Sequence, residues 1–114
     1  MNSLKLILAL STLLSTQAFA KEFNLKCMAK YNADKVLETE VKLASGARGV
    51  SFGEAEGFEF ILTQSGEKTV ELQAHNIFGE SRSYATAQLT DASSYVELSL
   101  WNREFIMEVR CTML

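Results

Sequence analysis

Hydrophobic and polar residues alternate along most of the chain after residue 21, and a period of two is the pattern of strands with one buried face. The clearest case lies near the C-terminus, where one face carries Phe105, Met107, Val109, Cys111 and Met113. Seven segments show this alternation, at residues 22–29, 36–43, 58–63, 69–75, 83–89, 95–101 and 104–113. A short strand over residues 50–52 would raise the number from seven to eight.

The links between these segments are short and carry turn residues, as in YNADK, QSGEK, IFGES, TDASS and NR. Short links make successive strands run antiparallel, and alternation on each strand leaves one face buried and the other in water. No segment has a sustained helical period. The pattern predicts an all-β fold, an antiparallel meander of seven or eight strands closing as a small barrel, with a β-sandwich as the alternative.

The first twenty residues differ from this pattern and have the layout of a secretory signal peptide. Lys5 precedes an apolar run at residues 6–14, and the small-x-small triplet at residues 18–20 predicts cleavage after Ala20. The run is too short for a membrane-spanning helix, which needs about 20 apolar residues. We therefore expect a cleaved leader at 1–20 and a single small β domain at 21–114, exported to the periplasm or secreted, without a membrane span.

Charge and composition exclude some partners. Removing Lys5 with the leader leaves 10 Lys and Arg against 14 Asp and Glu, a net charge of −4. The charges alternate with apolar residues and form no basic stretch, so we expect no binding to nucleic acid. The expected partner is an unknown protein or a component of the cell envelope.

The two cysteines, Cys27 and Cys111, lie on the apolar faces of the first and last predicted strands. An exported chain with two cysteines favours one disulfide. No Cys-x-x-Cys arrangement suggests redox activity. The sequence predicts that this disulfide links the first and last strands, a closure that contributes roughly 4–5 kcal/mol in the chain-entropy model.

Groups for catalysis or metal binding are few. The one histidine, His75, lies on the polar face of its strand, and no Gly-x-Ser-x-Gly motif or Asp-rich calcium loop is present. Glu54 and Glu56 are the only acids placed in a glycine-rich loop, where a paired-carboxylate hydrolase is the remaining catalytic hypothesis. We predict that the protein is not an enzyme and that it needs neither a cofactor nor a metal.

Two regions are candidate binding sites. The strand alternation directs Tyr95 and Trp101 outward on one strand and Arg82 and Tyr84 outward on the strand before it, so neighbouring strands would join them in one patch. Exposed Trp, Tyr and Arg are enriched at binding hot spots. The second region is the loop at residues 44–57, which holds four of the six glycines, and it is either a wide turn or a ligand-facing loop.

Part of that loop, ASGARG at residues 44–49, resembles a Ser-Gly-x-Gly-Ala-x-Tyr-like loop of the periplasmic inhibitors of c-type lysozyme. These inhibitors are small exported β-barrels with a cysteine near each end. The resemblance implies a role for Ser45 and Arg48 in inhibiting a lysozyme-like or other hydrolase. Gly49 stands where the family has tyrosine, and Trp101, in WNRE, lacks the Lys-Gly of the family's second motif.

The sequence thus leads to two functional hypotheses. The first is a small, exported, non-catalytic β domain that acts as a binding module for an unidentified ligand. The alternative is a periplasmic hydrolase inhibitor acting through the glycine-rich loop 44–57.

Overall fold

The computed structural model describes residues 22–114 and confirms an all-β fold with eight antiparallel strands. The predicted leader lies outside the described residues. The strands are β1 (Phe23–Tyr31), β2 (Asp34–Leu43), β3 (Val50–Ala55), β4 (Phe58–Gln64), β5 (Thr69–Asn76), β6 (Arg82–Gln88), β7 (Tyr95–Trp101) and β8 (Ile106–Met113). The short segment expected at residues 50–52 is therefore the start of a six-residue strand.

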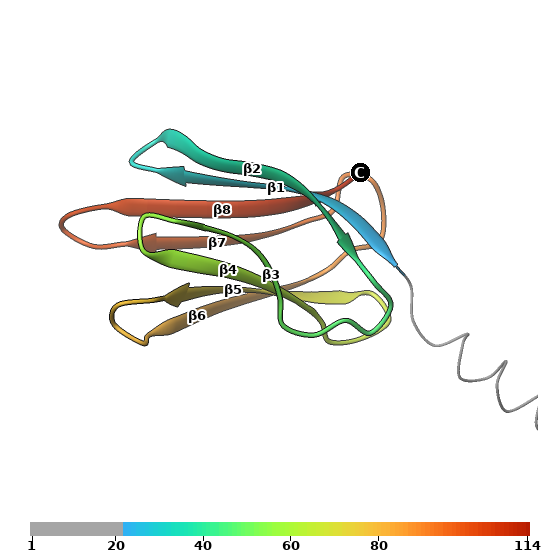
Figure 1. Ribbon diagram of the computed structural model, residues 1–114. Coiled ribbons are helices and arrows are strands. Elements are labelled where there is room, and N and C mark those ends of the chain that lie inside the picture. Colours follow the sequence, from blue (N-terminus) through green and yellow to red (C-terminus); the bar gives the residue numbers. More distant parts are fainter. Residues whose placement is uncertain (1–21) are drawn as a thin grey trace, which may run out of the picture.

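The strands form two four-stranded sheets, ordered β2-β1-β8-β7 and β3-β4-β5-β6 (Figure 1). We call them the first and the second sheet. Every strand lies beside its neighbour in the sequence, except that no strand pairing joins β2 to β3 or β6 to β7 within residues 22–114. The preferred expectation of a closed barrel is therefore not confirmed, and the alternative, a β-sandwich, fits the arrangement.

The core lies between the two sheets and is made by alternate residues of the strands, as the period of two predicts. Phe60, Leu62 and Leu72 from the second sheet and Leu25 and Leu43 from the first are fully buried. Burial of side chains of this size stabilises the fold by about 1.5–3 kcal/mol each. The alternating polar residues are consequently left on two outer faces.

The disulfide predicted from the sequence is present and joins Cys27 on β1 to Cys111 on β8. The two residues are direct partners in the strand register, and both are fully buried. Since β1 and β8 are the first and last strands, the disulfide fastens the two ends of the described chain together in the middle of the first sheet.

The hairpin turns divide between the two ends of the sandwich. The turns β1–β2, β3–β4, β5–β6 and β7–β8 lie at one end, on the left in Figure 1. The C-terminus and the beginning of β1 lie at the opposite end. We call the left end in Figure 1 the distal end.

Candidate binding surface

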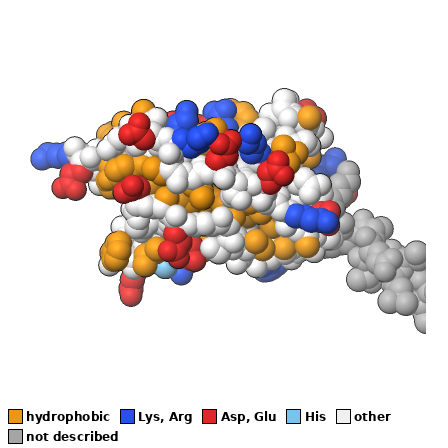
Figure 2. Space-filling view, turned by 45° about the horizontal axis from the view of Figure 1, so that its top comes forward, with side chains coloured by type: hydrophobic (Ala, Val, Ile, Leu, Met, Phe, Trp, Pro, Cys, Tyr) orange, Lys and Arg blue, Asp and Glu red, His pale blue; other side chains and the backbone are white. Residues whose placement is uncertain are grey.

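The outer face of the first sheet carries a row of four residues that crosses all its strands. Glu38, Met28, Arg110 and Glu97 are successive register partners on β2, β1, β8 and β7. Because register partners on one face bring their side chains close together, the row can form contacts across the sheet. Figure 2 shows positive and negative side chains interspersed over the upper part of the molecule, where this sheet lies in Figure 1.

At one end of the row, Arg110 is fixed by two neighbours. Its Nε donates a hydrogen bond to Glu97 Oε2 at 2.6 Å, and an Nη–Oε2 contact completes the ion pair. The guanidinium carbon also lies 4.3 Å from the centre of the Tyr95 ring. A guanidinium is attracted to the negative face of an aromatic ring, so Tyr95 and Glu97 together hold the Arg110 side chain in one orientation.

At the other end of the row, Glu38 is the acceptor for two lysines. Lys26 Nζ lies 3.0 Å from Glu38 Oε1, and Lys35 Nζ lies 2.6 Å from Oε2. The hydrogen bond from Lys35, followed by that from Lys26, lowers the pKa of the Glu38 carboxyl below its usual value of 4.5. At neutral pH the Glu38 carboxylate is therefore ionised and paired with both lysines.

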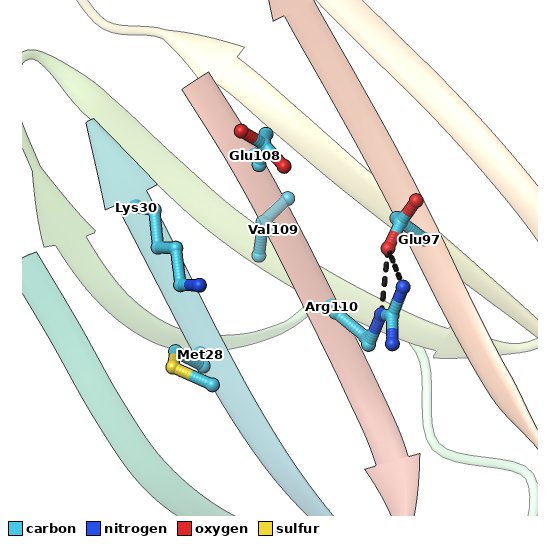
Figure 3. Close-up of a pocket in the computed structure, with 6 residues that line it drawn as sticks. All are labelled: Met28, Lys30, Glu97, Glu108, Val109 and Arg110. Carbon is cyan, nitrogen blue, oxygen red and sulfur yellow. Dashed lines mark hydrogen bonds and ion pairs between the residues drawn. The ribbon is translucent and has the colours of Figure 1, made fainter. Parts of the chain in front are cut away.

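Between these two ends lies a shallow hollow of about 200 Å³ (Figure 3), lined by Met28, Lys30, Glu97, Glu108, Val109 and Arg110. Lys30 and Glu108 are direct register partners, yet no ion pair forms between them in the described structure. In Figure 3 the Lys30 ammonium ends on the Met28 side of the hollow, away from Glu108. The hollow thus offers a cation, an anion and a thioether to an incoming group.

Trp101 lies on the same face, at the distal end. Trp101 is 77% exposed and its register partner Ile106 is 48% exposed, so the pair forms an apolar surface beside the β7–β8 turn. The turn is ordered by Asn102 Oδ1, which accepts hydrogen bonds from the backbone N–H groups of Glu104 and Phe105. The structure therefore places Tyr95 and Trp101, both predicted to face outward, on one outer face.

Arg82 and Tyr84 also face outward, but they lie on β6 in the second sheet. The patch expected from four neighbouring residues is accordingly divided between the outer faces of two sheets, because β6 and β7 are not paired. Across the second sheet, His75 is the register partner of both Arg82 and Glu59, and its Nδ1 lies 3.9 Å from Glu59 Oε1.

The glycine-rich loop is bound to β4 by its backbone. Gly46 N–H donates to Gln64 Oε1 at 2.7 Å, and Gly49 N–H donates to Thr63 Oγ1 at 2.9 Å. The side chains of Ser45 and Arg48 remain exposed. The structure divides the predicted loop 44–57: residues 44–49 connect β2 to β3 at the end opposite Trp101, and the rest forms β3 and the β3–β4 turn at the distal end.

The two acids that the sequence offered for catalysis are exposed to solvent. Glu54 and Glu56 are exposed on β3 and in the turn that follows it. Within residues 22–114, no group of three or more His, Cys, Asp or Glu side chains is arranged to hold a metal ion. The same part of the chain contains no helix long and apolar enough to cross a membrane.

Sequence reasoning did not find the residues that line the hollow. Arg110, Glu97, Lys30, Met28 and Glu108 are all on polar-patterned faces, so the outward direction of each was readable. Their proximity was not, because it depends on the register between β7, β8 and β1. The signal that could have identified Arg110 is the disulfide: pairing Cys27 with Cys111 places Met28 opposite Arg110.

Comparison of the chain with protein-family models, with curated proteins and with solved structures finds no match.

Proposed function

We propose that this domain is a non-catalytic binding module of an exported compartment, and that it engages another macromolecule through the outer face of its first sheet. The observation that carries the proposal is the contact of Arg110 with both Glu97 and the Tyr95 ring, beside the hollow in Figure 3. The partner is a protein or a component of the cell envelope.

The residue types on this face support binding. Trp, Tyr and Arg are the residues most enriched at hot spots, and this face presents Trp101, Tyr95 and Arg110. Glu97 already holds the Arg110 side chain, so less rotational freedom is lost when a partner docks. A mixture of both charge signs, with Lys30 and Glu108 available in the hollow, favours selection among partners by charge complementarity.

The absence of catalysis is part of the proposal. The general acid of a glycosidase is desolvated in a cleft, whereas Glu54 and Glu56 are solvent-exposed. The disulfide is compatible with export, since such bonds persist in oxidising compartments.

The test is affinity capture of partners from the source cells with the oxidised domain, followed by mass spectrometry. We expect the Trp101→Ala, Tyr95→Ala double variant to lose partners that the unchanged domain retains. Tyr84→Ala is the matched control, because Tyr84 is 55% exposed and lies on the other sheet. Identical partner profiles for the unchanged domain and the double variant would show that this face does not bind the captured partners.

A second candidate function, inhibition of a lysozyme-like or other hydrolase, is favoured by the attachment of the glycine-rich loop to Gln64 and Thr63. A loop held in this way presents Ser45 and Arg48 with a reduced entropy cost on binding. Lysozyme activity on cell walls should fall when the domain is added, and the Ser45→Ala, Arg48→Ala variant should inhibit less. Full activity at a large molar excess of the domain would exclude the lysozyme version.

A further inference from the structure

Two neighbouring turns at the distal end hold an exposed aromatic ring on the second sheet. Phe78, in the β5–β6 turn, is 87% exposed, and the adjacent Ile77 is 40% exposed. The Phe78 ring lies over Gly57 of the β3–β4 turn, where an added Cβ would come within 3.0 Å of Phe78 Cε2. Ile77 N–H donates to Gly57 C=O at 2.9 Å, so the two turns are joined as one unit.

The β5–β6 turn is also fixed internally by Asn76. Its Oδ1 accepts hydrogen bonds from the backbone N–H groups of Phe78 and Gly79, both at 3.1 Å. Its carbonyl accepts another from Glu80 N–H at 2.9 Å. The exposed ring is therefore presented by an ordered turn, and little backbone freedom remains to be lost when a partner covers it.

The charges around Phe78 are mainly negative. The segments 54–59 and 75–82 contain four glutamates and a single Arg or Lys, Arg82. Glu54 and Glu59 are direct register partners on β3 and β4, an arrangement of like charges that normally destabilises a sheet. In Figure 2, hydrophobic side chains with acidic side chains beside them occupy the lower left, where Figure 1 places the β5–β6 turn.

We propose that Phe78 is the anchor of a second binding site, and that its partner is a basic protein with an apolar pocket for the ring. Interface cores are enriched in aromatic residues, and a surrounding polar rim fixes register and partner choice. The exposed acids Glu54, Glu56 and Glu80 provide a rim that matches Lys and Arg. An anionic membrane surface would be repelled by the same acids.

This site is separate from the proposed function of the first sheet, since every residue in it belongs to the second sheet or its turns. Either site can fail without affecting the other.

The experiment measures binding to the immobilised, oxidised domain by biolayer interferometry. The probes are proteins extracted from the source cells and separated by ion exchange into a basic and an acidic pool. We expect a response from the basic pool that falls roughly tenfold in Phe78→Ser, as for loss of a hot-spot side chain. A Glu56→Lys, Glu80→Lys double variant should reduce it similarly, and raising the salt from about 0.05 M to about 0.5 M should slow association.

Two matched controls distinguish binding at this site from nonspecific binding to apolar or acidic surface residues. Leu114→Ser removes an apolar side chain that is 60% exposed at the opposite end, and Glu67→Lys reverses an exposed acid in the β4–β5 turn. Both should bind as the unchanged domain does, and unfolding midpoints should show that all variants are folded. The proposal is overturned by a response from the acidic pool alone, by an unchanged response in Phe78→Ser, by no response from either pool, or by Phe78-dependent binding to anionic phospholipid vesicles.

Discussion

Cys27 lies directly opposite Cys111 on two antiparallel strands, with their Cα atoms 4.0 Å apart and their sulfurs joined. The residues are 84 positions apart in the sequence, so the disulfide closes a loop that contains most of the described chain. It lies between the two central strands of the first sheet, directly under the outer face that carries Met28 and Arg110. The bond therefore joins β1 and β8 covalently, in register, beneath the candidate binding surface.

Removing the disulfide should cost a large part of the stability. For Cys27→Ala, Cys111→Ala we expect a loss of about 2–5 kcal/mol in the free energy of unfolding, mainly because the unfolded chain regains its freedom. Urea denaturation followed by far-UV circular dichroism measures the loss. A mass measurement of the untreated protein should show two hydrogens fewer than the reduced form. Equal urea midpoints with and without reductant would contradict the prediction.

Two buried glutamines should respond in opposite ways to replacement by leucine. Gln64 accepts from Gly46 N–H, and its Nε2 donates to Glu67 C=O at 3.3 Å, so Gln64→Leu should lower the free energy of unfolding by about 1–3 kcal/mol. Gln73 is also buried, but its Nε2 has no hydrogen-bond partner in the described structure. Gln73→Leu should be neutral or stabilising by up to about 1 kcal/mol. Thermal and urea unfolding of both variants decide the signs, and a Gln73→Leu variant less stable than Gln64→Leu would disprove this account.

A side chain at Gly57 should destabilise the fold. Its φ is +82°, and an added Cβ would meet the Phe78 ring, so Gly57→Ala should destabilise by about 1–3 kcal/mol. Gly46→Ala is the control, because its φ is +71° but nothing lies within 4 Å of the added carbon. The difference in unfolding free energy between the two variants measures the contact with Phe78. It should shrink when both carry Phe78→Ala, and a difference that survives this change would show that the ring is not responsible.

The loop before β7 should make stability depend on pH through Asp91. Its Oδ1 accepts from Ser93 Oγ at 2.7 Å, from Ser93 N–H at 2.9 Å and from Ser94 Oγ at 3.2 Å. These bonds, that from the Ser93 hydroxyl first, lower the pKa of the Asp91 carboxyl below its usual value of 3.8. The ionised group therefore stabilises the fold above pH 3.8, and this contribution is lost as the pH falls through the lowered pKa.

Urea midpoints of the unchanged domain and of Asp91→Asn, measured between about pH 2 and pH 6, test this dependence. The advantage of the unchanged domain should be absent at the acid end and grow as the pH rises. Glu38, whose pKa is also lowered, is present in both proteins and cancels in the difference. Parallel curves for the two proteins would show that Asp91 does not contribute in this way.

The alternation of residue types predicted the strands well because each has one face in the core. The predicted strand bounds are wrong at two places, where a register shift or a side-chain hydrogen bond changes the local backbone. The glycines after Ser51 suggested an early end to the third strand, whereas Gly53 lies within β3, at a shift in its register with β4. The last strand begins at Ile106 rather than at residue 104, because Asn102 Oδ1 holds Glu104 and Phe105 in the turn.

The sequence by itself determined the strands, which residues face outward, and the pairing of the cysteines. The first two follow from a period of two and from short connections, and the third follows because an exported chain with two cysteines favours one disulfide. Only the tertiary structure decided where the sheet divides. That division separates Tyr84 from Tyr95, although their strands are consecutive in the chain. It depends on how the two sheets pack around Phe60 and its neighbours, and such contacts between distant strands leave no trace in local periodicity. The same holds for the contact of Arg110 with Tyr95, which register alone creates.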